Sequence, residues 1–368
     1  MSKKNPSDFL LIFCILSLVC IGVIMVFSAS IYSSSVNYGD QYYLFKKQLL
    51  FAGIGLIVMY IVSKVNYKIY FKYHKHIMII SIILLIAVLI PGIGKSLNYA
   101  RRWIYVAGMS FQPSEIAKVA AIIFTAASVA NLKEKIRTFT RGILPYLILI
   151  GILCVLIYLE PDLSTALVIA LIIIGIIFVA GGNMGYLMSL GSVLGVGVIY
   201  AAFFTDFRKG RLDAFFNPTE HLTEGGWQAQ QSLLALGSGG IFGQGLGNGK
   251  QKMFYLPEPQ NDFIFAHIGE ELGLIGTLLI LALFLLLIWR GLRIALYAPD
   301  TFASLLAFGI IFMIGIQVII NIFVVTQIMP VTGMPLPFIS AGGSSLVLLM
   351  ASMGILINIS KYTPISRR

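Results

Sequence analysis

Long apolar stretches recur along the whole chain and restrict it to very few folds. Each is long enough to cross about 30 Å of hydrocarbon as a helix, and unpaired backbone polar groups are not tolerated in lipid. The composition agrees, since 58% of the residues are hydrophobic and only 11% are charged, against roughly a quarter charged in soluble domains. We predict an all-α polytopic membrane protein with ten transmembrane helices, at residues 9–28, 46–63, 76–91, 115–131, 143–159, 163–181, 186–204, 262–289, 302–328 and 338–360.

The basic residues predict how these helices are oriented, because short cytoplasmic loops are enriched in Lys and Arg. With the N-terminus inside, 15 of the 26 Lys and Arg residues fall in cytoplasmic segments, and 12 of the 15 acidic residues fall on or near the outer face. We therefore predict two cytoplasmic termini and a single membrane domain over residues 1–368. One long extracytoplasmic loop, 205–261, is predicted between helices 7 and 8.

Charge and cysteine placement exclude several functions. The net charge of +11 is explained by a cytoplasmic rim that meets anionic lipid headgroups, so we expect no nucleic-acid partner. Cys14, Cys20 and Cys154 all lie within predicted helices, which gives no disulfide framework. The four histidines have no metal-binding spacing,.

Acidic residues gather where the eighth predicted helix begins. Glu258, Asp262, Glu270 and Glu271 lie within residues 256–276. A carboxylate at the centre of a lipid-facing helix costs roughly 2.5–3.5 kcal/mol, so acids at such a position usually face protein or a watery cavity. All four are candidates for a functional site. We expect Asp262 to carry the chemistry, Glu258 to assist it, and the other two to be buried structural groups.

A second cluster lies between the third and fourth predicted helices. Arg101 and Arg102 are suited to forked binding of a diphosphate, although contact with lipid headgroups would also explain them. Trp103 is placed either to stack on a sugar or to join the interfacial aromatic belt. Downstream, Ser114 is predicted to cap the fourth helix.

Glu115 and Lys118 are three residues apart in that fourth helix, so they share one face,. We expect an ion pair near the outer end of the helix, where each charge lowers the cost of burying the other. A purely structural pair is the alternative to a role in substrate binding.

Two further segments interrupt the helices near the outer face. In the tight turn at residues 160–165, Asp162 is expected to cap the sixth helix,. Residues 329–345 contain three prolines and several glycines that break a membrane segment. Broken backbone at membrane depth must be buried in protein or line a cavity, so this segment indicates a site or a gate.

Residues 237–250 form a glycine-rich run that invites comparison with phosphate-binding loops. The nucleotide motif Gly-x-x-x-x-Gly-Lys-Ser/Thr is absent, because Lys250 is followed by Gln251,. Backbone N–H groups with Lys250 and Lys252 remain candidates for holding an anionic headgroup. A flexible or re-entrant loop is the alternative.

Together these segments resemble the SEDS family, the shape, elongation, division and sporulation proteins. The resemblance covers essentially the whole chain, with somewhat more likeness to the FtsW division branch than to the RodA elongation branch. It rests on motifs in the family's order: Ala-Arg-Arg-Trp-Ile (100–104), Phe-Gln-Pro-Ser-Glu (111–115), Pro-Asp-Leu (161–163), Gln-x-x-Gln-Ser (228–232), Gly-Ser-Gly-Gly (237–240), Gly-x-Gly-x-Gly-Asn-Gly (243–249), Asp-Phe-Ile-Phe (262–265) and Pro-Leu-Pro-Phe-Ile-Ser (335–340).

The resemblance implies a peptidoglycan glycosyltransferase that polymerises lipid II on the outer face of the bacterial cytoplasmic membrane. Its implied partners are a class B penicillin-binding protein and other divisome or elongasome membrane proteins. Asp262 corresponds to the family's essential aspartate and would act as the base. A divalent cation, Mg²⁺ or Mn²⁺, is a candidate cofactor. The predicted substrate-binding residues are Arg101, Arg102, Trp103, Gln112, Glu115, Lys118, Asp162, Gln228, Gln231, Lys250, Glu258 and Ser340.

Two other functions stay open from the sequence. A lipid II flippase would use the same polar cavity as a passage and would need no base. It would also need polar groups deep in several helices, whereas mid-helix polar residues such as Gln317 and Asn321 are few. A scaffold that only recruits a synthase is the third possibility.

Overall fold

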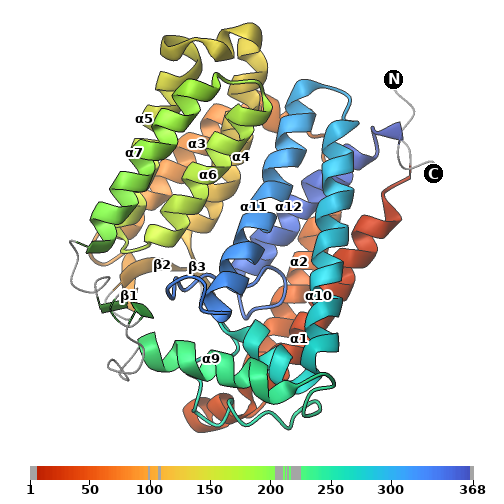
Figure 1. The fold of residues 1–368 in the computed structure, drawn as a ribbon. Helices are drawn as coiled ribbons and strands as arrows, with labels where there is room; N and C mark the ends of the chain where they lie inside the picture. Colours follow the sequence, from red (N-terminus) through yellow and green to blue (C-terminus); the bar gives the residue numbers. More distant parts are fainter. Residues whose placement is uncertain are drawn as a thin grey trace.

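A computed structural model gives the fold of the chain and describes residues 6–97, 100–106, 109–203, 210–211, 213, 215–216 and 225–364. Most of the first part of the predicted 205–261 loop lies outside these residues. Helices run side by side in a bundle, with a small sheet and one crossing helix at one end (Figure 1). The helices are α1 (Phe9–Tyr38), α2 (Tyr43–Lys64), α3 (Lys68–Leu89), α4 (Pro113–Leu132), α5 (Leu144–Leu159), α6 (Leu163–Val179), α7 (Met184–Phe203), α9 (Gly225–Gly239), α10 (Ile264–Leu296), α11 (Thr301–Val325) and α12 (Ser344–Ser360), with a 3-10 helix η1 (Lys133–Arg137) and a π-helix η2 (Phe139–Ile143) between α4 and α5.

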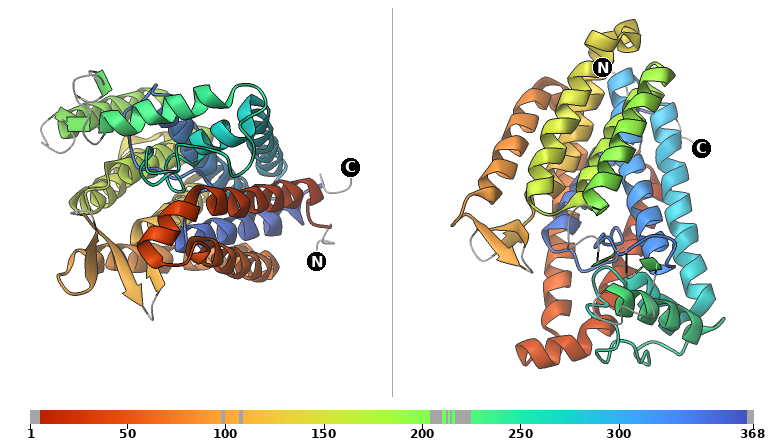
Figure 2. Two further views of the ribbon diagram at one scale, coloured as in Figure 1. Left: turned by 90° about the horizontal axis from the view of Figure 1, so that it is seen from below. Right: turned by 60° about the vertical axis from the view of Figure 1, so that its left-hand side comes forward.

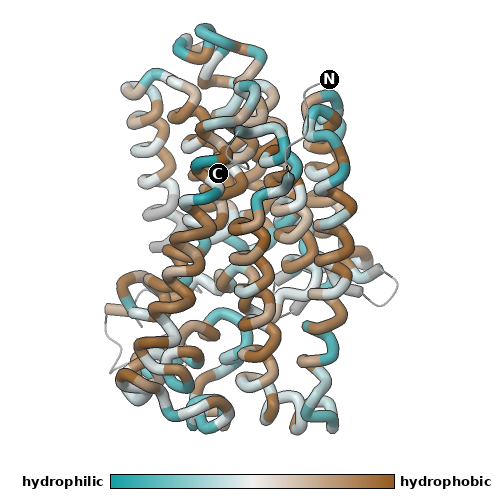
Figure 3. Tube along the Cα trace, turned by 90° about the vertical axis from the view of Figure 1, so that its right-hand side faces the viewer, coloured by the Kyte–Doolittle hydropathy of each residue, from teal (hydrophilic) through white to brown (hydrophobic). Residues whose placement is uncertain are grey.

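Each of the ten predicted membrane segments corresponds to one apolar helix of the bundle. Seven of these helices are long and apolar enough to cross a membrane within the described residues, and α6, α7 and α12 contribute shorter apolar stretches. A 17-residue helix such as α6 is about 25 Å long, slightly less than the hydrocarbon core. Hydrophobic residues cover the middle of the bundle and hydrophilic residues gather at its ends (Figure 3). A polytopic membrane protein is therefore confirmed.

The helices pack as neighbours that are often distant in sequence. α2 packs mainly against α12, α3 against α4, and α10 against α11. α11 also contacts α4 and α6, which places it between the two halves of the bundle (Figures 1 and 2). Because α11 is covered on several sides, its polar residues must find partners inside the protein.

A three-stranded antiparallel sheet precedes α4, and the sequence did not predict it. Its strands β1 (Gly94–Leu97), β2 (Ala100–Val106) and β3 (Met109–Phe111) follow one another in order. β2 pairs with both neighbours and carries the predicted Arg-Arg-Trp cluster. The sheet lies with α9 at the end of the bundle opposite the start of α1 and the end of α12 (Figure 1).

Two breaks in the helices shape that same end. α10 is interrupted at Gly273, whose φ of 66° and ψ of −164° are non-helical, a conformation that glycine adopts at little cost. The second break is the irregular segment 326–343 between α11 and α12. The tenth predicted helix begins at 344 rather than 338, because residues 335–343 are a largely buried stretch of irregular backbone and turns.

The irregular segment is packed directly against α1. A Cβ placed on Gly22 would lie 2.6 Å from the carbonyl oxygen of Phe338 and 2.7 Å from the Cα atom of Ile339. Both contacts are with main-chain atoms, which a rotamer change cannot relieve. Gly22 therefore lets α1 approach the segment closely.

We expect Gly22→Ala to lower the free energy of unfolding by roughly 1–3 kcal/mol, the usual cost of overpacking. Gly53→Ala is the matched control, since Gly53 also lies inside a helix but has no atom within 4 Å of its added Cβ. That control is expected to be neutral or stabilising, because alanine favours helix by up to about 1 kcal/mol over glycine. Thermal unfolding in detergent measures both. Equal unfolding temperatures for the two variants would contradict the prediction.

Candidate active site

Asp262 lies just before α10, on a loop that the rest of the protein holds tightly. Asn321, 1% exposed within α11, donates from Nδ2 to the carbonyl oxygens of both Asp262 and Met334, each at 2.8 Å. One amide group thus joins the loop before α10 to the irregular segment after α11. The Asp262 main chain is therefore held by α11, while Glu258, Arg211, Arg102 and Asp162 act electrostatically on its carboxylate.

Ser340 makes a second connection between the same two segments. Its Oγ donates to the carbonyl oxygen of Asn261 at 2.6 Å and accepts from the N–H of Leu336 at 2.8 Å. The N–H of Ala341 donates to the carbonyl oxygen of Gln260 at 2.9 Å. The predicted role of the Ser340 hydroxyl in substrate binding stays a prediction, and in this structure the hydroxyl is engaged in holding the loop.

The surroundings of Asp262 adjust its proton affinity. Burial, reinforced by the nearby Glu258 and Asp162 carboxylates, raises the pKa of Asp262 to about 6, against the opposing effect of Arg211 and Arg102. At neutral pH the group is therefore mostly ionised, yet it is a stronger base than an ordinary aspartate. These electrostatic partners also show that the loop before α10, the α5–α6 turn and β2 meet at one place.

Arg102 reaches this place from β2. Its Nε donates to the carbonyl oxygen of Glu160 at 2.9 Å, and its Nη2 donates to that of Pro161. Successive residues of a strand point to opposite faces, so Arg101 and Trp103 lie on the other face of β2, and Arg101 is exposed. The structure therefore brings only the second arginine of the predicted pair to Asp262.

Asp162 serves as the N-cap of α6, as the sequence predicted. Its Oδ1 accepts from the N–H of Thr165 at 3.1 Å, and its Oδ2 accepts from the Thr165 hydroxyl at 2.9 Å. Gln112 donates from Nε2 to the same Oδ2 at 3.1 Å. Two predicted site residues are thus in direct contact, at the junction of α4 and α6.

The predicted ion pair in α4 is confirmed, because Lys118 Nζ lies 2.7 Å from Glu115 Oε1 and the lysine side chain is only 4% exposed. Both residues line a cavity that Gln317 and Ser340 also line. The predicted cap of α4 was wrong. Gln112 occupies the N-cap position, and the buried hydroxyl of Ser114 has no partner among the described residues.

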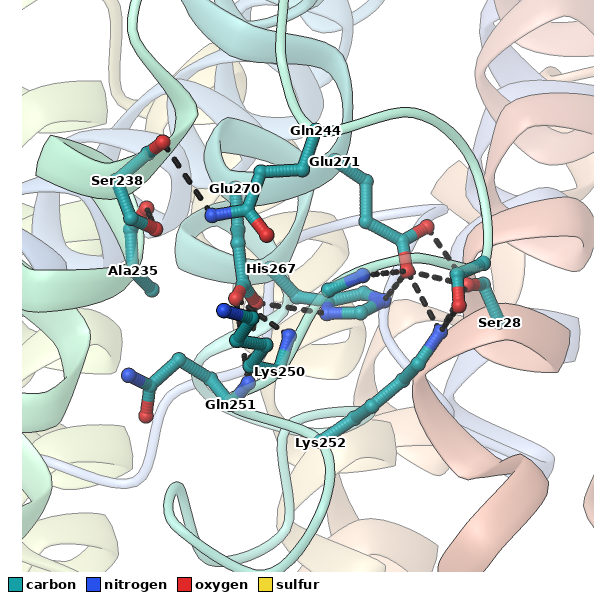
Figure 4. A network of polar contacts seen from close by, with 12 residues as sticks. Ser28, Ala235, Ser238, Gln244, Lys250, Gln251, Lys252, His267, Glu270 and Glu271 are labelled. Atoms are coloured by element: carbon teal, nitrogen blue, oxygen red, sulfur yellow. Dashed lines mark hydrogen bonds and ion pairs between the residues drawn. The ribbon is translucent and has the colours of Figure 1, made fainter.

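The glycine-rich loop at 240–252 is bound to the first part of α10. The Glu270 carboxylate accepts from the N–H groups of Lys250 at 2.7 Å and Gln251 at 3.2 Å (Figure 4). Main-chain N–H groups of this loop are thus already bonded to Glu270, which argues against the hypothesis that they hold an anionic headgroup. The Lys250 side chain remains exposed, and its contact with substrate stays a prediction.

Glu271 is the centre of a buried polar cluster beside that loop. Its carboxylate lies 2.8 Å from Lys252 Nζ and accepts from the Ser28 hydroxyl of α1 at 2.7 Å (Figure 4). The N–H of Gly249 and the ring of His267 approach the same carboxylate at 3.3 Å. The cluster ties α1, the glycine-rich loop and α10 together, in line with the structural role expected for this acid.

The predicted roles of two glutamines in substrate binding stay predictions. Gln228 and Gln231 lie three residues apart on α9, which packs against α10. The described residues contain no group of three or more His, Cys, Asp or Glu side chains that could hold a metal ion. The described side chains alone thus do not make a metal site, and the divalent cation stays a prediction.

Sequence reasoning gave no role to three residues that the structure places at the site. Asn321, 59 positions away in the chain, bonds the carbonyl oxygen of Asp262. Arg211, 51 positions away, acts electrostatically on the Asp262 carboxylate. Glu160 is fully buried beside Arg102. The only available signal for Asn321 was a polar residue in the middle of an apolar helix.

Comparison with known proteins identifies the family. The sequence profile of the FtsW/RodA/SpoVE family, described as cell cycle proteins, matches residues 8–365. The chain belongs to this family, the SEDS proteins. The resemblance drawn from the motifs is thereby confirmed, and this SEDS chain is a multi-pass protein of the bacterial cytoplasmic membrane.

Relatives and solved structures cover almost all of this SEDS chain. Stage V sporulation protein E of Bacillus subtilis is 46% identical over 362 residues, covering 98% of this chain and 99% of that protein. The probable peptidoglycan glycosyltransferase FtsW of Geobacter sp. strain M18 is 40% identical over 360 residues, covering 98% of each. The rod shape determining protein RodA of Thermus thermophilus has a TM-score of 0.70 at 26% identity, covering 97% of this chain and 98% of its own.

One chain of a solved peptidoglycan synthase complex, studied for the structural coordination of polymerization and crosslinking, has a TM-score of 0.78 at 25% identity. The match covers 96% of this SEDS chain and 97% of that chain. The chain thus has a RodA-like fold.

We expect Lys252→Met to lower the free energy of unfolding by about 3–5 kcal/mol, because it leaves the Glu271 carboxylate buried without its cation. Lys46→Met is the matched control, since Lys46 also lies 2.8 Å from a carboxylate, that of Asp40, but both side chains are exposed. Its loss of stability is expected to be far smaller than that of Lys252→Met, because both partners of this pair remain in contact with water,. Thermal unfolding in detergent compares the two.

The double variant Lys252→Met/Glu271→Gln tests the cause of that loss. Removing both charges is expected to recover part of the stability that the single substitution loses, since no unpaired charge stays buried. Glu271→Gln alone is measured as well. If the losses of the two single variants simply add up in the double variant, the two groups are not coupled.

Proposed function

We propose that this protein is a peptidoglycan glycosyltransferase that polymerises lipid II, with Asp262 as the catalytic base. The observation that supports this most directly is a carboxylate of raised pKa, that of Asp262, which lies within the electrostatic influence of Arg102 where the loop before α10, β2 and the α5–α6 turn come together. Several of the compared relatives carry the name of probable peptidoglycan glycosyltransferase. The site offers what such a reaction requires.

Glycan polymerisation joins a sugar hydroxyl of one lipid II molecule to the anomeric carbon of another, and the lipid diphosphate departs. A base has to remove the hydroxyl proton, and cations have to stabilise the charge that develops on the leaving group. With its pKa raised to about 6, Asp262 is ionised at neutral pH and can accept that proton. A single base is sufficient for an inverting displacement.

Two basic side chains support the proposed binding of the diphosphate. Arg102 gives its hydrogen bonds to main-chain carbonyl groups, so no carboxylate neutralises its charge through these contacts. Lys118 lines the neighbouring cavity and is oriented by its ion pair with Glu115. We propose that both contact the leaving group and that Glu115 positions the lysine.

We also propose that all ten apolar helices cross the membrane and that the site faces outward. The start of α1 and the end of α12 lie at the same end of the bundle, and β2 and α9 lie at the other end (Figure 1). The basic loops, such as residues 64–75 and 133–141, predict that the first end is cytoplasmic,. Lipid II exposed on the outer face would then reach Asp262 directly.

The proposed partner is a class B penicillin-binding protein, which would crosslink the strands that this chain makes. The match to a chain of a peptidoglycan synthase complex that couples polymerization to crosslinking supports this pairing. The compared relatives at 40–46% identity are a stage V sporulation protein E and a probable peptidoglycan glycosyltransferase FtsW, and the motifs also resemble the FtsW branch more than the RodA branch. We therefore favour a role in division or sporulation over elongation.

Asp262→Asn is expected to abolish polymerisation of purified lipid II, a loss of at least about 100-fold, because the amide cannot accept the proton. Asp300→Asn is the matched control, since Asp300 caps α11 at the opposite end of the bundle. Gel analysis of glycan strands, with the partner protein present, measures both. Full glycan synthesis by Asp262→Asn would refute the base, whereas lipid II movement across vesicles without any polymerisation by the unaltered protein would favour a flippase.

Asn321→Ala is expected to slow polymerisation at least about tenfold while leaving some activity, because it frees the Asp262 backbone but keeps the carboxylate. Asn358→Ala is the matched control: Asn358 is equally buried and also bonds two main-chain groups, but at the far end of α12. Both variants should lose similar stability. Equal activity per folded molecule in the two variants would show that the Asn321 amide does not position the base.

A further inference from the structure

Glu160 is a buried acid to which neither the sequence motifs nor the proposed reaction gives a task. It lies in the turn between α5 and α6, its side chain is 0% exposed, and neither of its carboxyl oxygens has a hydrogen-bond partner among the described residues. A buried carboxylate without partners is very unfavourable. The geometry therefore indicates a neutral carboxylic acid at this position.

Electrostatics agree with the geometry. Burial, followed by the neighbouring Asp162 carboxylate, raises the pKa of Glu160 to about 8, and Arg102 opposes the shift only in part. The charged groups that act on Glu160 are thus Asp162 from its own turn and Arg102 from β2, while Asp262 is influenced by the same two residues. The acid is protonated at neutral pH and titrates just above it.

The charge on Glu160 affects whether the Arg102 guanidinium group can bind an anion. The guanidinium group donates to the carbonyl oxygens of Glu160 and Pro161, which hold it in place without neutralising it. A neutral Glu160 leaves that positive charge available to an anionic diphosphate. An ionised Glu160 would place a carboxylate next to the same arginine and compete with the diphosphate for it.

We propose that Glu160 is a positioning residue that must remain a neutral acid, so that Arg102 stays available to the diphosphate of lipid II and the enzyme loses activity when Glu160 ionises. The proposal rests on the proposed function of Asp262 and Arg102. No group is transferred, because Glu160 only releases its proton to the solvent at alkaline pH.

The test is the pH profile of lipid II polymerisation, measured from about pH 5 to 9.5 with the partner protein present. For the unaltered protein we expect activity to rise as Asp262 ionises near pH 6 and to fall by up to about tenfold per pH unit above pH 8. Glu160→Gln keeps the shape of a neutral acid but cannot ionise. It should retain activity within about twofold at pH 7 and lose the alkaline decline below pH 9.5.

Glu134→Gln is the matched control, since Glu134 is an exposed glutamate in η1 and should leave both limbs of the profile unchanged. Glu160→Met is a second neutral variant of similar size, in case the amide of Glu160→Gln disturbs folding. It should also lack the alkaline decline. An unchanged alkaline decline in the folded neutral variants would overturn the proposal, and so would loss of activity at every pH in both of them.

Infrared spectroscopy separates this inference from the proposed function, because it needs no activity. The unaltered protein should show a protonated carboxyl band at pH 7 that disappears around pH 8 and is missing in Glu160→Gln. Absence of that band at pH 7 would refute the neutral acid even if polymerisation is normal. A correct band in a protein that does not polymerise lipid II would count against the proposed function alone.

Discussion

The site depends on hydrogen bonds that join two irregular segments inside a helical bundle. Asn321 bonds the carbonyl oxygens of Asp262 and Met334, and Ser340 bonds that of Asn261. Without these bonds, main-chain carbonyl groups inside the bundle would lack partners, and a buried polar group without a partner costs free energy. The same bonds that satisfy the backbone therefore also fix the proposed base, and Gly22 allows α1 to close against the segment.

Much of the fold followed from the sequence because hydrocarbon thickness sets the length of a membrane helix. All ten predicted segments became helices, and the errors lie at their ends. α1 continues to Tyr38 instead of stopping at 28, since its last turns extend beyond the apolar run. The three-stranded sheet was missed because its strands are short, and their pairing depends on contacts that no local pattern reveals.

The site was predictable where a local rule applied. Asp162 as a helix cap and the Glu115–Lys118 pair follow from spacing alone. The partnership of Asp262 with Asn321 and Arg102 does not, because it is created by chain segments that meet only in the folded bundle. Gln112 was predicted as a site residue from its motif. Its contact with Asp162 could not be predicted, because it depends on the packing of α4 against α6.

The glycine-rich loop shows that a repeated glycine pattern can arise from close packing of the main chain. Gln244 and Gly245 donate their N–H groups to carbonyl oxygens of Glu270 and Glu271, while the N–H of Leu274 donates back to Gly240. Two stretches of main chain lie against each other here, and a Cβ on Gly239 or Gly243 would clash with the carbonyl oxygen of Gly269 or Glu271. Gly239 and Gly243 are therefore explained by close contact with the main chain of α10, a part of the same protein, and not by a bound anion.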